Sequence, residues 1–448
     1  MNGLNRTGRT IIIIGGGASG VLLAANIIRE RIPGTRVLMV EKSGRLGAGL
    51  AYSTLNPNHI LNVPAKGMSA FADEADHFWN WLRATGATPP DDPEVFAPRH
   101  LYSQYLASLI ASEGGVTFVP SACVGINELP SGVEVKLENG TSLIGHAAVL
   151  AVGHEERQMR GRGLVIRAGS QQDTPLDPYA KTMILGSGLS MVDAWLSLVG
   201  NGHLGPILVV SRNGLLPRKH RPTEPLPLNA EDIPFGSSVP KFAHWFLDTV
   251  KKAVAKGGDW RSVVDGLRPH NQRIWQSWSL ADRKRFLTHL RPFWNIHRHR
   301  LPPHVHDRLT AASSSGQITV IAGTFLGVDR EGDKLIATVR RRGLDHPETV
   351  EVARLYDCGG VSVNIEESSN PVINGLVHSG LGRPDALKIG LDVTPDGALI
   401  GADGSVSNRV YALGPLTRGT FFEIESVPEI RVEAQKLARR LTGDVTVA

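Results

Sequence analysis

The sequence predicts an α/β protein with two Rossmann-like, three-layer domains, of which the first is discontinuous along the chain and the second carries a helical insertion. A short β-branched run, a glycine-rich turn and an apolar helical pattern occur in that order near residues 10–29 and again near 182–200. Each copy then continues through a strand, a hairpin and a strand that ends at glycine. A chain of 448 residues also exceeds what one hydrophobic core usually supports, so two domains are expected.

The first copy reads RTIIIIGGGASGVLLAANIIRE and is followed by the strand RVLMVEK, a hairpin about an Asn-Gly turn, and a strand that ends at Gly153. Gly15, Gly17 and Gly20 form a G-x-G-x-x-G pattern between strand and helix. The first glycine permits the tight turn, the second lets the backbone approach a pyrophosphate, and the third allows the helix to pack on the strand. The pattern predicts a dinucleotide site, against the simpler interpretation that the glycines only turn the chain.

An acidic residue follows at the position that usually binds the ribose of such a dinucleotide. Glu41 ends the next strand, 21 residues after Gly20. A carboxylate there accepts hydrogen bonds from ribose hydroxyls and disfavours a 2′-phosphate. The first domain is therefore expected to bind a dinucleotide whose ribose carries no 2′-phosphate.

The second copy, KTMILGSGLSMVDAWLSLV, has a shorter glycine pattern. Gly186, Ser187 and Gly188 form the turn, and Met191 stands where a third glycine would be. The following strand ends in Ser211 and Arg212 instead of an acid, with further basic residues at Arg218, Lys219 and Arg221. A hydroxyl and a guanidinium can hold a 2′-phosphate, which favours NADPH over NADH. The alternative is a solvated basic loop.

The C-terminal segment carries NRVYALGPL, a strand, and VPEIRVEAQKLARRL, a helix with Pro428 in its first turn. The strand has no partner nearby, so it is expected to return to the first sheet, and the helix could direct its N-terminus at the flavin. We therefore expect an FAD domain over 1–156 and 360–448, an NAD(P) domain over 157–214 and 313–359, and a helical insertion over 215–312.

The insertion holds Trp260, Trp275, Trp278 and Trp294 and the segment RPFWNIHRHRLPPHVHDRL. Four histidines, at 297, 299, 304 and 306, suggest a metal, but no cysteine and only Asp307 accompany them, so no metal site is expected. The segment is better explained as a surface that binds an anionic substrate or the nicotinamide nucleotide, with His297, Arg298 and His299 as the substrate candidates, although any one histidine could simply make a structural hydrogen bond. The tryptophans could either line that pocket or form the core of the insertion.

Composition excludes several other classes of protein. Cys123 and Cys358 are the two cysteines, far apart, so neither a disulfide scaffold nor a local redox-active pair is expected. The net charge of +5 is spread along the chain, which argues weakly for nucleic acid. The apolar stretch from Ile11 to Ile28 is interrupted by three glycines and Asn26, which argues against a membrane span or leader. A cytoplasmic protein that binds neither membrane nor nucleic acid is expected.

The whole chain resembles the FAD/NAD(P)-binding flavoproteins related to flavin-dependent N-hydroxylases and class B-type flavin monooxygenases. The resemblance rests on IIIIGGGASG, EKSGRLGAGLAYST, HILNVPAKGMSAF, FAPRHLYSQYL, AVLAVGH, ILGSGLSMVD, SRNGLLPRKH and YALGPLTRGTFFEIESVPEIR. The Met191 variant and the Trp- and His-rich insertion depart from the ornithine and lysine hydroxylases.

The resemblance implies roles for residues along both halves of the first domain. The glycine turn with Ala18, Ser19, Glu41 and Lys42 would contact the pyrophosphate and ribose of FAD. Residues 62–69, with Asn62 and Met68, would lie against the isoalloxazine, and Val124 would touch the adenine through its backbone. Gly153, Gly414 and the segment Thr420, Phe421 and Phe422 complete the expected FAD site.

Two dinucleotide sites in one chain indicate hydride transfer from a nicotinamide to the flavin. We expect an FAD-dependent NAD(P)H oxidoreductase, most simply a monooxygenase that uses molecular oxygen and a hydroperoxyflavin to hydroxylate a small polar substrate such as an amino acid or a purine of the urate type. The alternatives are a reductase or dehydrogenase without oxygen insertion, and an FAD-binding redox sensor.

Overall fold

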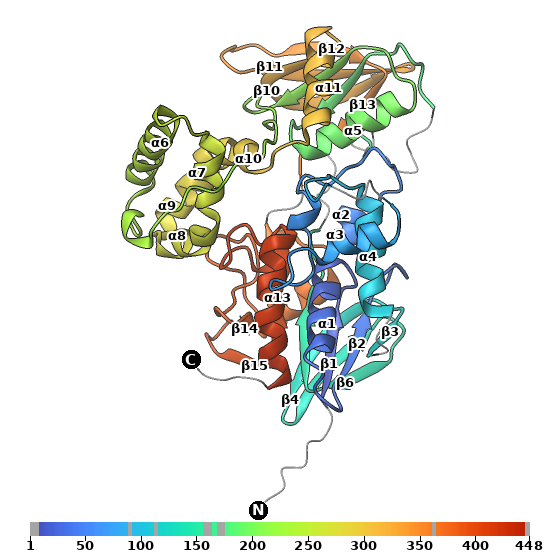
Figure 1. Ribbon diagram of the computed structural model, residues 1–448. Coiled ribbons are helices and arrows are strands. Elements are labelled where there is room, and N and C mark those ends of the chain that lie inside the picture. Colours follow the sequence, from blue (N-terminus) through green and yellow to red (C-terminus); the bar gives the residue numbers. More distant parts are fainter. Residues whose placement is uncertain are drawn as a thin grey trace, which may run out of the picture. The chain divides into compact units, whose positions relative to one another are not determined.

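The computed structural model describes residues 9–87, 92–111, 115–155, 164–167, 175–360 and 364–443. The chain divides into two compact units (Figure 1). The first comprises residues 1–57, 63–155 and 362–448, and the second comprises residues 58–62 and 156–361. The first unit is discontinuous because the second is inserted into it, and a short segment of the N-terminal half joins the second unit.

A six-stranded sheet forms the centre of the first unit, in the order β14-β15-β7-β1-β2-β3. All neighbouring strands are parallel except β14 and β15. The strands are β1 (Thr10–Ile14), β2 (Arg36–Val40), β3 (Val116–Val119), β7 (Ala147–Leu150), β14 (Ala398–Ile400) and β15 (Val406–Ala412). Strands β1 and β7 are almost wholly buried and apolar, as expected of a parallel sheet covered on both faces.

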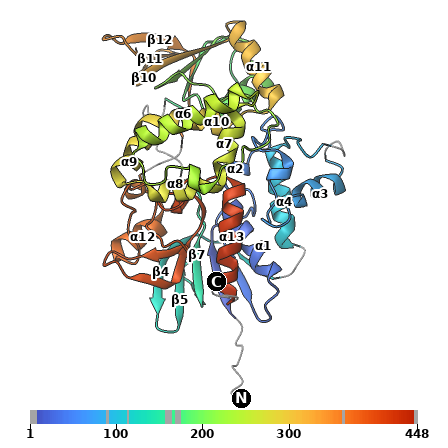
Figure 2. The same ribbon diagram turned by 60° about the vertical axis from the view of Figure 1, so that its left-hand side comes forward.

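The C-terminal strand returns to this sheet, as the sequence predicts. Val410, Tyr411 and Ala412 of β15 pair in parallel with Ala148, Val149 and Leu150 of β7. Helix α13 (Val427–Thr442) then packs along α1 (Ala18–Arg29), and the two lie side by side in Figures 1 and 2. The predicted discontinuous first domain is therefore confirmed.

A second layer lies against β1 and β7 and is a three-stranded antiparallel sheet of β4 (Cys123–Leu129), β5 (Gly132–Leu137) and β6 (Ser142–Gly145). The turn between β5 and β6 contains Asn139 and Gly140, and Gly140 has φ +82°. The remaining helices of this unit are α2 (Gly49–Tyr52), α3 (His77–Ala84), α4 (Arg99–Ala111) and α12 (Pro371–Ser379), with short 3-10 turns at Ala65–Gly67, Ile365–Glu367 and Gly414–Thr417.

The second unit contains a six-stranded sheet in the order β12-β11-β10-β9-β8-β13. Its strands are β8 (Thr182–Leu185), β9 (Ile207–Ser211), β10 (Ile318–Glu331), β11 (Lys334–Arg341), β12 (Glu348–Val352) and β13 (Arg354–Asp357). Strands β10, β9, β8 and β13 run parallel, whereas β11 and β12 are antiparallel to their neighbours.

Alternating residues of the parallel strands face two separate cores. Ile184 and Val209 face α5 (Leu189–Gly200) and α11 (Pro303–Ser314), which cover one side. Met183 and Leu208 face the other side, where β10, β11 and β12 supply Val328, Val339 and Val352. Because successive side chains of a strand point to opposite faces, one face of the sheet packs against helices and the other packs against the antiparallel strands.

The insertion is helical, as predicted. It contains α6 (Val239–Ala255), α7 (Trp260–Gly266), α8 (Asn271–Ser277), α9 (Leu280–Arg285), a π-helical turn at Phe286–Leu290 and α10 (Arg291–Arg298), with 3-10 turns at Ala230–Asp232 and Arg268–His270. Figure 2 shows these helices as one group. Among the described residues, no helix is both long and apolar enough to cross a membrane.

Candidate functional site

The turn between β1 and α1 can be built only with glycine at two positions. Gly15 has φ +109°, and a Cβ on it would lie 2.4 Å from the Ala151 carbonyl oxygen at the end of β7. A Cβ on Gly20 would lie 2.0 Å from the Gly15 carbonyl oxygen. The helix therefore begins in direct backbone contact with the turn, as the roles of the first and third glycines require.

Gly17 differs from both because nothing in the protein occupies the space beside it. Its φ is −73°, and a Cβ there would meet only the Gly49 Cα, at 3.5 Å. Gly17 caps α1 without a side-chain hydrogen bond to the first-turn amides, which belong to Ala18 and Ser19. An open cradle at an uncapped helix N-terminus fits a pyrophosphate, which accepts hydrogen bonds and favours the positive end of the dipole.

The C-terminal segment closes on the same turn. The Leu413 amide donates to the Leu150 carbonyl at 2.9 Å. Gly414 follows with φ +77°, and a Cβ on it would lie 2.4 Å from Ser19 Oγ. Residues 395 positions apart in sequence, Ser19 and Gly414, are thus brought together at the N-terminus of α1.

Glu41 lies at the carboxyl end of β2, beside the glycine turn. Its Oε2 accepts a hydrogen bond from the Gly16 amide at 2.8 Å, and its Oε1 accepts one from the Ser43 amide at 2.7 Å. These bonds fix the carboxylate, while each oxygen retains a lone pair that can accept from a ribose hydroxyl. Lys42, the next residue, is exposed.

The other predicted FAD residues lie in varied environments. Met68 is buried at the end of the 3-10 turn, and Gly153 follows β7 with φ +71° and open space beside it. Val124 is exposed on β4. Asn62 belongs to segment 58–62 of the second unit.

The segment before α13 is held by its own hydrogen bonds. Thr420 donates from its hydroxyl to the Val393 carbonyl at 3.2 Å, Phe421 is buried, and Phe422 is half-buried. Ser426 caps α13 and donates to the Glu429 carboxylate in the first turn of the helix. The negative charge of this carboxylate partly offsets the positive end of the α13 dipole, which the sequence suggested could point at the flavin.

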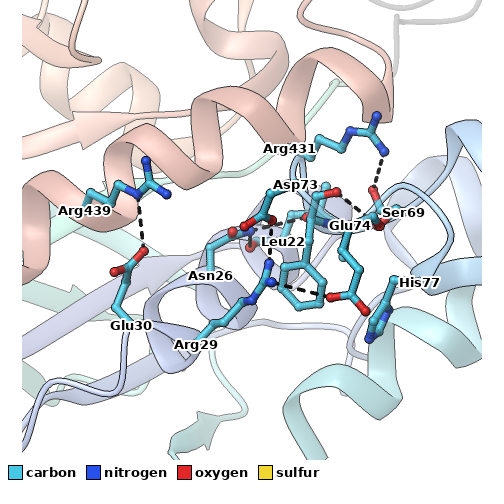
Figure 3. A network of polar contacts seen from close by, with 12 residues as sticks. Leu22, Asn26, Arg29, Glu30, Ser69, Asp73, Glu74, His77, Arg431 and Arg439 are labelled. Carbon is cyan, nitrogen blue, oxygen red and sulfur yellow. Dashed lines mark hydrogen bonds and ion pairs between the residues drawn. The ribbon is translucent and has the colours of Figure 1, made fainter.

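The structure reveals a network around α1 that sequence reasoning missed (Figure 3). Arg29, in the last turn of α1, contacts Asp73 at 2.6 Å and Glu74 at 3.5 Å, and its guanidinium lies 4.4 Å from the centre of the Phe71 ring. Asn26 is buried in α1 and donates to the Ala70 carbonyl at 3.4 Å. Helix α1 therefore positions residues 70–74, which directly follow Met68.

Helix α13 contributes to the same network from the opposite end of the chain. Arg431 donates to the Ser69 carbonyl at 3.2 Å, and Arg439 lies 3.5 Å from Glu30 of α1 (Figure 3). The sequence offers no signal for these contacts beyond the presence of arginines in the predicted helix, because the contacting residues come from three distant segments. The segment around Met68 is thus attached to both helices.

The second glycine turn repeats the backbone geometry of the first. Gly186 has φ +97°, and a Cβ on it would lie 2.4 Å from the Cys358 carbonyl oxygen after β13. A Cβ on Gly188 would meet nothing within 4 Å, and this residue caps α5 without a side-chain hydrogen bond. Met191, in contrast to Gly20, is fully buried among the residues beneath α5.

Two serines that the sequence names separately as candidates for nucleotide binding are in contact. Ser187 Oγ lies 2.8 Å from Ser211 Oγ and 2.6 Å from the Leu215 carbonyl oxygen, so the two hydroxyls join the ends of β8 and β9. Arg212 is exposed, and next to it Asn213 accepts a hydrogen bond from Arg342 at 3.2 Å. Arg342 is a second basic residue at this corner that the sequence did not single out.

The tryptophans of the insertion divide into two groups. Trp275 and Trp278 are buried in its core with Phe286. Trp260 instead meets His297 edge to face, with ring centres 4.7 Å apart. Trp294 packs against Phe246, with ring centres 6.2 Å apart, so the four tryptophans do not share one environment.

The three substrate candidates point to different surroundings. His297 contacts the Phe293 carbonyl through Nδ1 at 2.8 Å, Arg298 is buried, and His299 is half-buried. An open hollow of about 310 Å³ lies elsewhere in this unit, lined by Leu216, Pro217, His306, Leu309, Thr310, Ser313 and Ser314. Across the described part of the chain, no three His, Cys, Asp or Glu side chains come together to hold a metal ion.

These features define a class of protein with two dinucleotide-binding Rossmann units. Residues 12–155, within the first unit, match the model of the FAD-NAD(P)-binding family. This match confirms the predicted FAD and NAD(P) cofactor class and the flavoprotein resemblance.

Solved structures with the same fold span both units. The ornithine N-hydroxylase of Kutzneria sp. 744 aligns with a TM-score of 0.69 and 14% identity over 98% of this chain and 99% of that one. The cadaverine monooxygenase of Erwinia amylovora, solved with FAD, gives 0.68 and 13% over 98% and 95%. The thioredoxin reductase of Lactococcus lactis gives 0.54 and 11% over 98% and 100%.

Proposed function

We propose that the protein is an FAD-dependent NAD(P)H oxidoreductase and that it acts as a monooxygenase on a small polar substrate. The observation that carries the proposal is the pairing of two open glycine cradles, at Gly17 and Gly188, each at an uncapped helix N-terminus. Their next strands end differently, in Glu41 and in Ser211 with Arg212. One cradle suits a ribose with free hydroxyls and the other suits a ribose 2′-phosphate.

In the first unit the protein binds and orients FAD. The amides at Gly17, Ala18 and Ser19 hold the pyrophosphate, and Glu41 accepts from the adenosine ribose. Gly15, Gly20 and Gly153 shape the turn, Lys42 and Val124 lie along the adenosine half, and Met68, Gly414, Thr420, Phe421 and Phe422 lie toward the flavin ring. Bound FAD supplies the electron transfer and the reaction with oxygen, so few protein side chains need to act chemically.

In the second unit Gly186, Ser187 and Gly188 hold the nicotinamide nucleotide, and Ser211 and Arg212 read its 2′-phosphate. Asn62 is kept among the residues proposed for FAD binding on the family resemblance alone. The overall reaction balances as substrate, oxygen, NADPH and a proton giving hydroxylated substrate, water and NADP⁺. Both hydride electrons and the proton are consumed in reducing one oxygen atom to water.

The choice of a monooxygenase is supported by structural neighbours named as ornithine, lysine and cadaverine hydroxylases. A reductase is the second candidate because thioredoxin and bacillithiol disulfide reductases share the fold. The chain has only Cys123 and Cys358, which lie in different units, so a local cysteine pair would not carry electrons to a disulfide.

The test is to mix the yellow holoprotein with NADPH without oxygen and then admit oxygen with candidate amines, amino acids and purines. Bleaching by NADPH is expected, followed by equal consumption of NADPH and oxygen and a product heavier by one oxygen atom. Stoichiometric hydrogen peroxide with every candidate would favour the reductase, and no bleaching would favour a redox sensor.

The insertion is proposed to contact the substrate through His297, Arg298 and His299. His297→Ala and Arg298→Ala should weaken substrate-dependent turnover much more than anaerobic flavin reduction by NADPH. If both variants instead lose flavin reduction and keep substrate affinity, the insertion serves the nicotinamide nucleotide.

A further inference from the structure

A buried guanidinium with unused donors lies where α10 ends. Arg300 is 5% exposed, and its Nη2 contacts both carboxylate oxygens of Asp265 on α7, at 2.5 and 2.7 Å. Its Nε and Nη1 are buried and have no hydrogen-bond partner in the protein. Buried donors left unpaired are costly, so two unpaired donors on one charged group point to a ligand that accepts from them.

Further arginines surround this group because three segments meet there. The Arg218 amide donates to the Ile296 carbonyl at 2.9 Å, and the Leu301 amide donates to the Arg218 carbonyl at 2.8 Å. Arg261 donates from Nε and Nη2 to the Lys219 carbonyl at 3.0 and 2.7 Å. These bonds hold residues 218–219 between Arg261 of α7 and residues 296–301.

The rings of Trp260 and His297 lie beside these arginines, and we call this pair the Trp260–His297 wall. The Arg261 guanidinium lies 4.3 Å from the centre of the Trp260 ring, and the His297 ring meets the same indole edge to face. Burial, and then the charges of Arg218, Arg261 and Arg300, lower the pKa of His297. The charges of three guanidinium groups therefore act on the same imidazole.

Positive charge exceeds negative charge within this cluster. Arg261 is paired with Asp259 at 2.9 Å and Arg300 with Asp265 at 2.5 Å. Arg218 and Arg221 add two further charges, and Arg221 is close enough to Arg261 to lower the pKa of that guanidinium, which burial lowers most. An anion would relieve this excess, and planar guanidinium groups bind carboxylates and phosphates through paired hydrogen bonds.

We propose that Arg300, with Arg218 and the Trp260–His297 wall, forms an oxyanion subsite in the insertion that binds the carboxylate or phosphate of a small acidic substrate. The proposal rests on the proposed function, because it assigns the subsite to the substrate of that reaction. It assigns specific groups to the anionic substrate that the basic segment 297–299 suggests. Arg300, which neighbours the sequence-predicted candidates, is the central group.

The subsite can be tested by calorimetric titration of the FAD-loaded protein with succinate and with inorganic phosphate at constant ionic strength. Arg300→Lys keeps a positive charge beside Asp265 but removes the planar fork, and Arg218→Ala changes an exposed residue. Each should weaken binding of at least one of the two anions about tenfold or more, the loss expected for a charge-assisted hydrogen bond. Arg273→Ala, an exposed arginine over the Phe235 ring in the same insertion, is the matched control and should bind as wild type.

A second measurement separates the substrate from the nicotinamide nucleotide as the source of the oxyanion. In anaerobic flavin reduction, Arg300→Lys should change the half-saturating NADPH concentration no more than Arg273→Ala does. A tenfold rise would assign the arginines to the nucleotide and overturn the proposal, as would unaltered anion binding in both Arg300→Lys and Arg218→Ala. The titration needs no turnover, so failure of the monooxygenase assignment would not hide failure of the subsite.

Discussion

The two glycine turns have the same backbone but different third positions. Gly15 and Gly186 both have strongly positive φ, and each would press a Cβ to 2.4 Å from a carbonyl at the end of the neighbouring strand. Gly20 then touches the Gly15 carbonyl, whereas the corresponding Met191, in the first turn of α5, is buried in the core of the second unit. The first glycine is therefore required by the turn itself, but the third is required only where helix and turn are in contact.

The two units also differ in whether the hairpin that follows the parallel strands belongs to the same sheet. In the first, Pro120 follows β3, and the next strand, β4, joins the separate three-stranded sheet. In the second, β10 has no such interruption: it pairs with β9 at Ile318–Ala322 and then with β11 from Gly323 onward. Pro120 cannot donate to a sheet ladder, which is consistent with the end of the β3 pairing at this residue.

The largest contrast is expected from Gly20→Ala and Met191→Ala. The new methyl group at position 20 would meet backbone at 2.0 Å, which cannot give way, so we expect destabilisation above about 5 kcal/mol and loss of FAD. Met191→Ala should cost about 2 to 5 kcal/mol through a cavity. Urea unfolding followed by circular dichroism measures both. A Gly20→Ala protein as stable as wild type would contradict the close contact.

Gly17→Val and Gly188→Val should separate the two cofactors. Both glycines have ordinary negative φ and open space, so each variant should fold. We expect Gly17→Val to be colourless, because its side chain fills the pyrophosphate cradle, and Gly188→Val to keep FAD but respond poorly to NADPH. Each variant is the control for the other. Stoichiometric FAD in folded Gly17→Val would rule out the cradle assignment.

Arg212→Ala tests whether Arg212 of the second unit, at the position that corresponds to Glu41 of the first, recognises a 2′-phosphate. Loss of a charge-assisted contact of about 1.5 to 3 kcal/mol should raise the half-saturating NADPH concentration by roughly tenfold or more, with little change for NADH. Steady-state flavin reduction with both nucleotides measures this. Arg330→Ala, an exposed arginine on the β10 hairpin, should change neither value. Equal effects of Arg212→Ala on both nucleotides would show that Arg212 does not read the phosphate.

The smallest expected effect concerns Arg29, which has no basic counterpart in the last turn of α5. Burial acts to raise the pKa of Asp73, but the hydrogen bond and charge of Arg29 outweigh it and lower that pKa. The pair therefore stabilises the fold above the unfolded pKa of Asp73, about 4, and this contribution disappears as pH falls through the lower folded value.

Because Arg29 and Asp73 are 40% and 53% exposed, solvent screening limits the pair to about 0.2 to 1 kcal/mol. Arg29→Ala should lose this amount at pH 7 and less at pH 3 in urea unfolding. Asp73→Asn should remove the pH-dependent part. A loss that is the same at both pH values would assign the effect to the Phe71 contact instead.

The sequence alone determined the two Rossmann units, the Asn139-Gly140 hairpin and the return of the C-terminal strand. These follow from rules that act over a few residues: glycine at positive φ, strand and helix periods, and proline at strand ends. The segment GVTFVPSACVGINEL, whose pattern predicts one strand, instead forms two strands in different sheets, β3 and β4.

Only the tertiary structure decided which distant charges meet. Arg29 with Asp73, Arg431 with Ser69, and Arg300 with Asp265 each join segments separated by tens to hundreds of residues. No local pattern encodes such pairs, because an exposed arginine and a buried one look alike in sequence. Packing decides which guanidinium is removed from water, and that burial makes its unused donors informative.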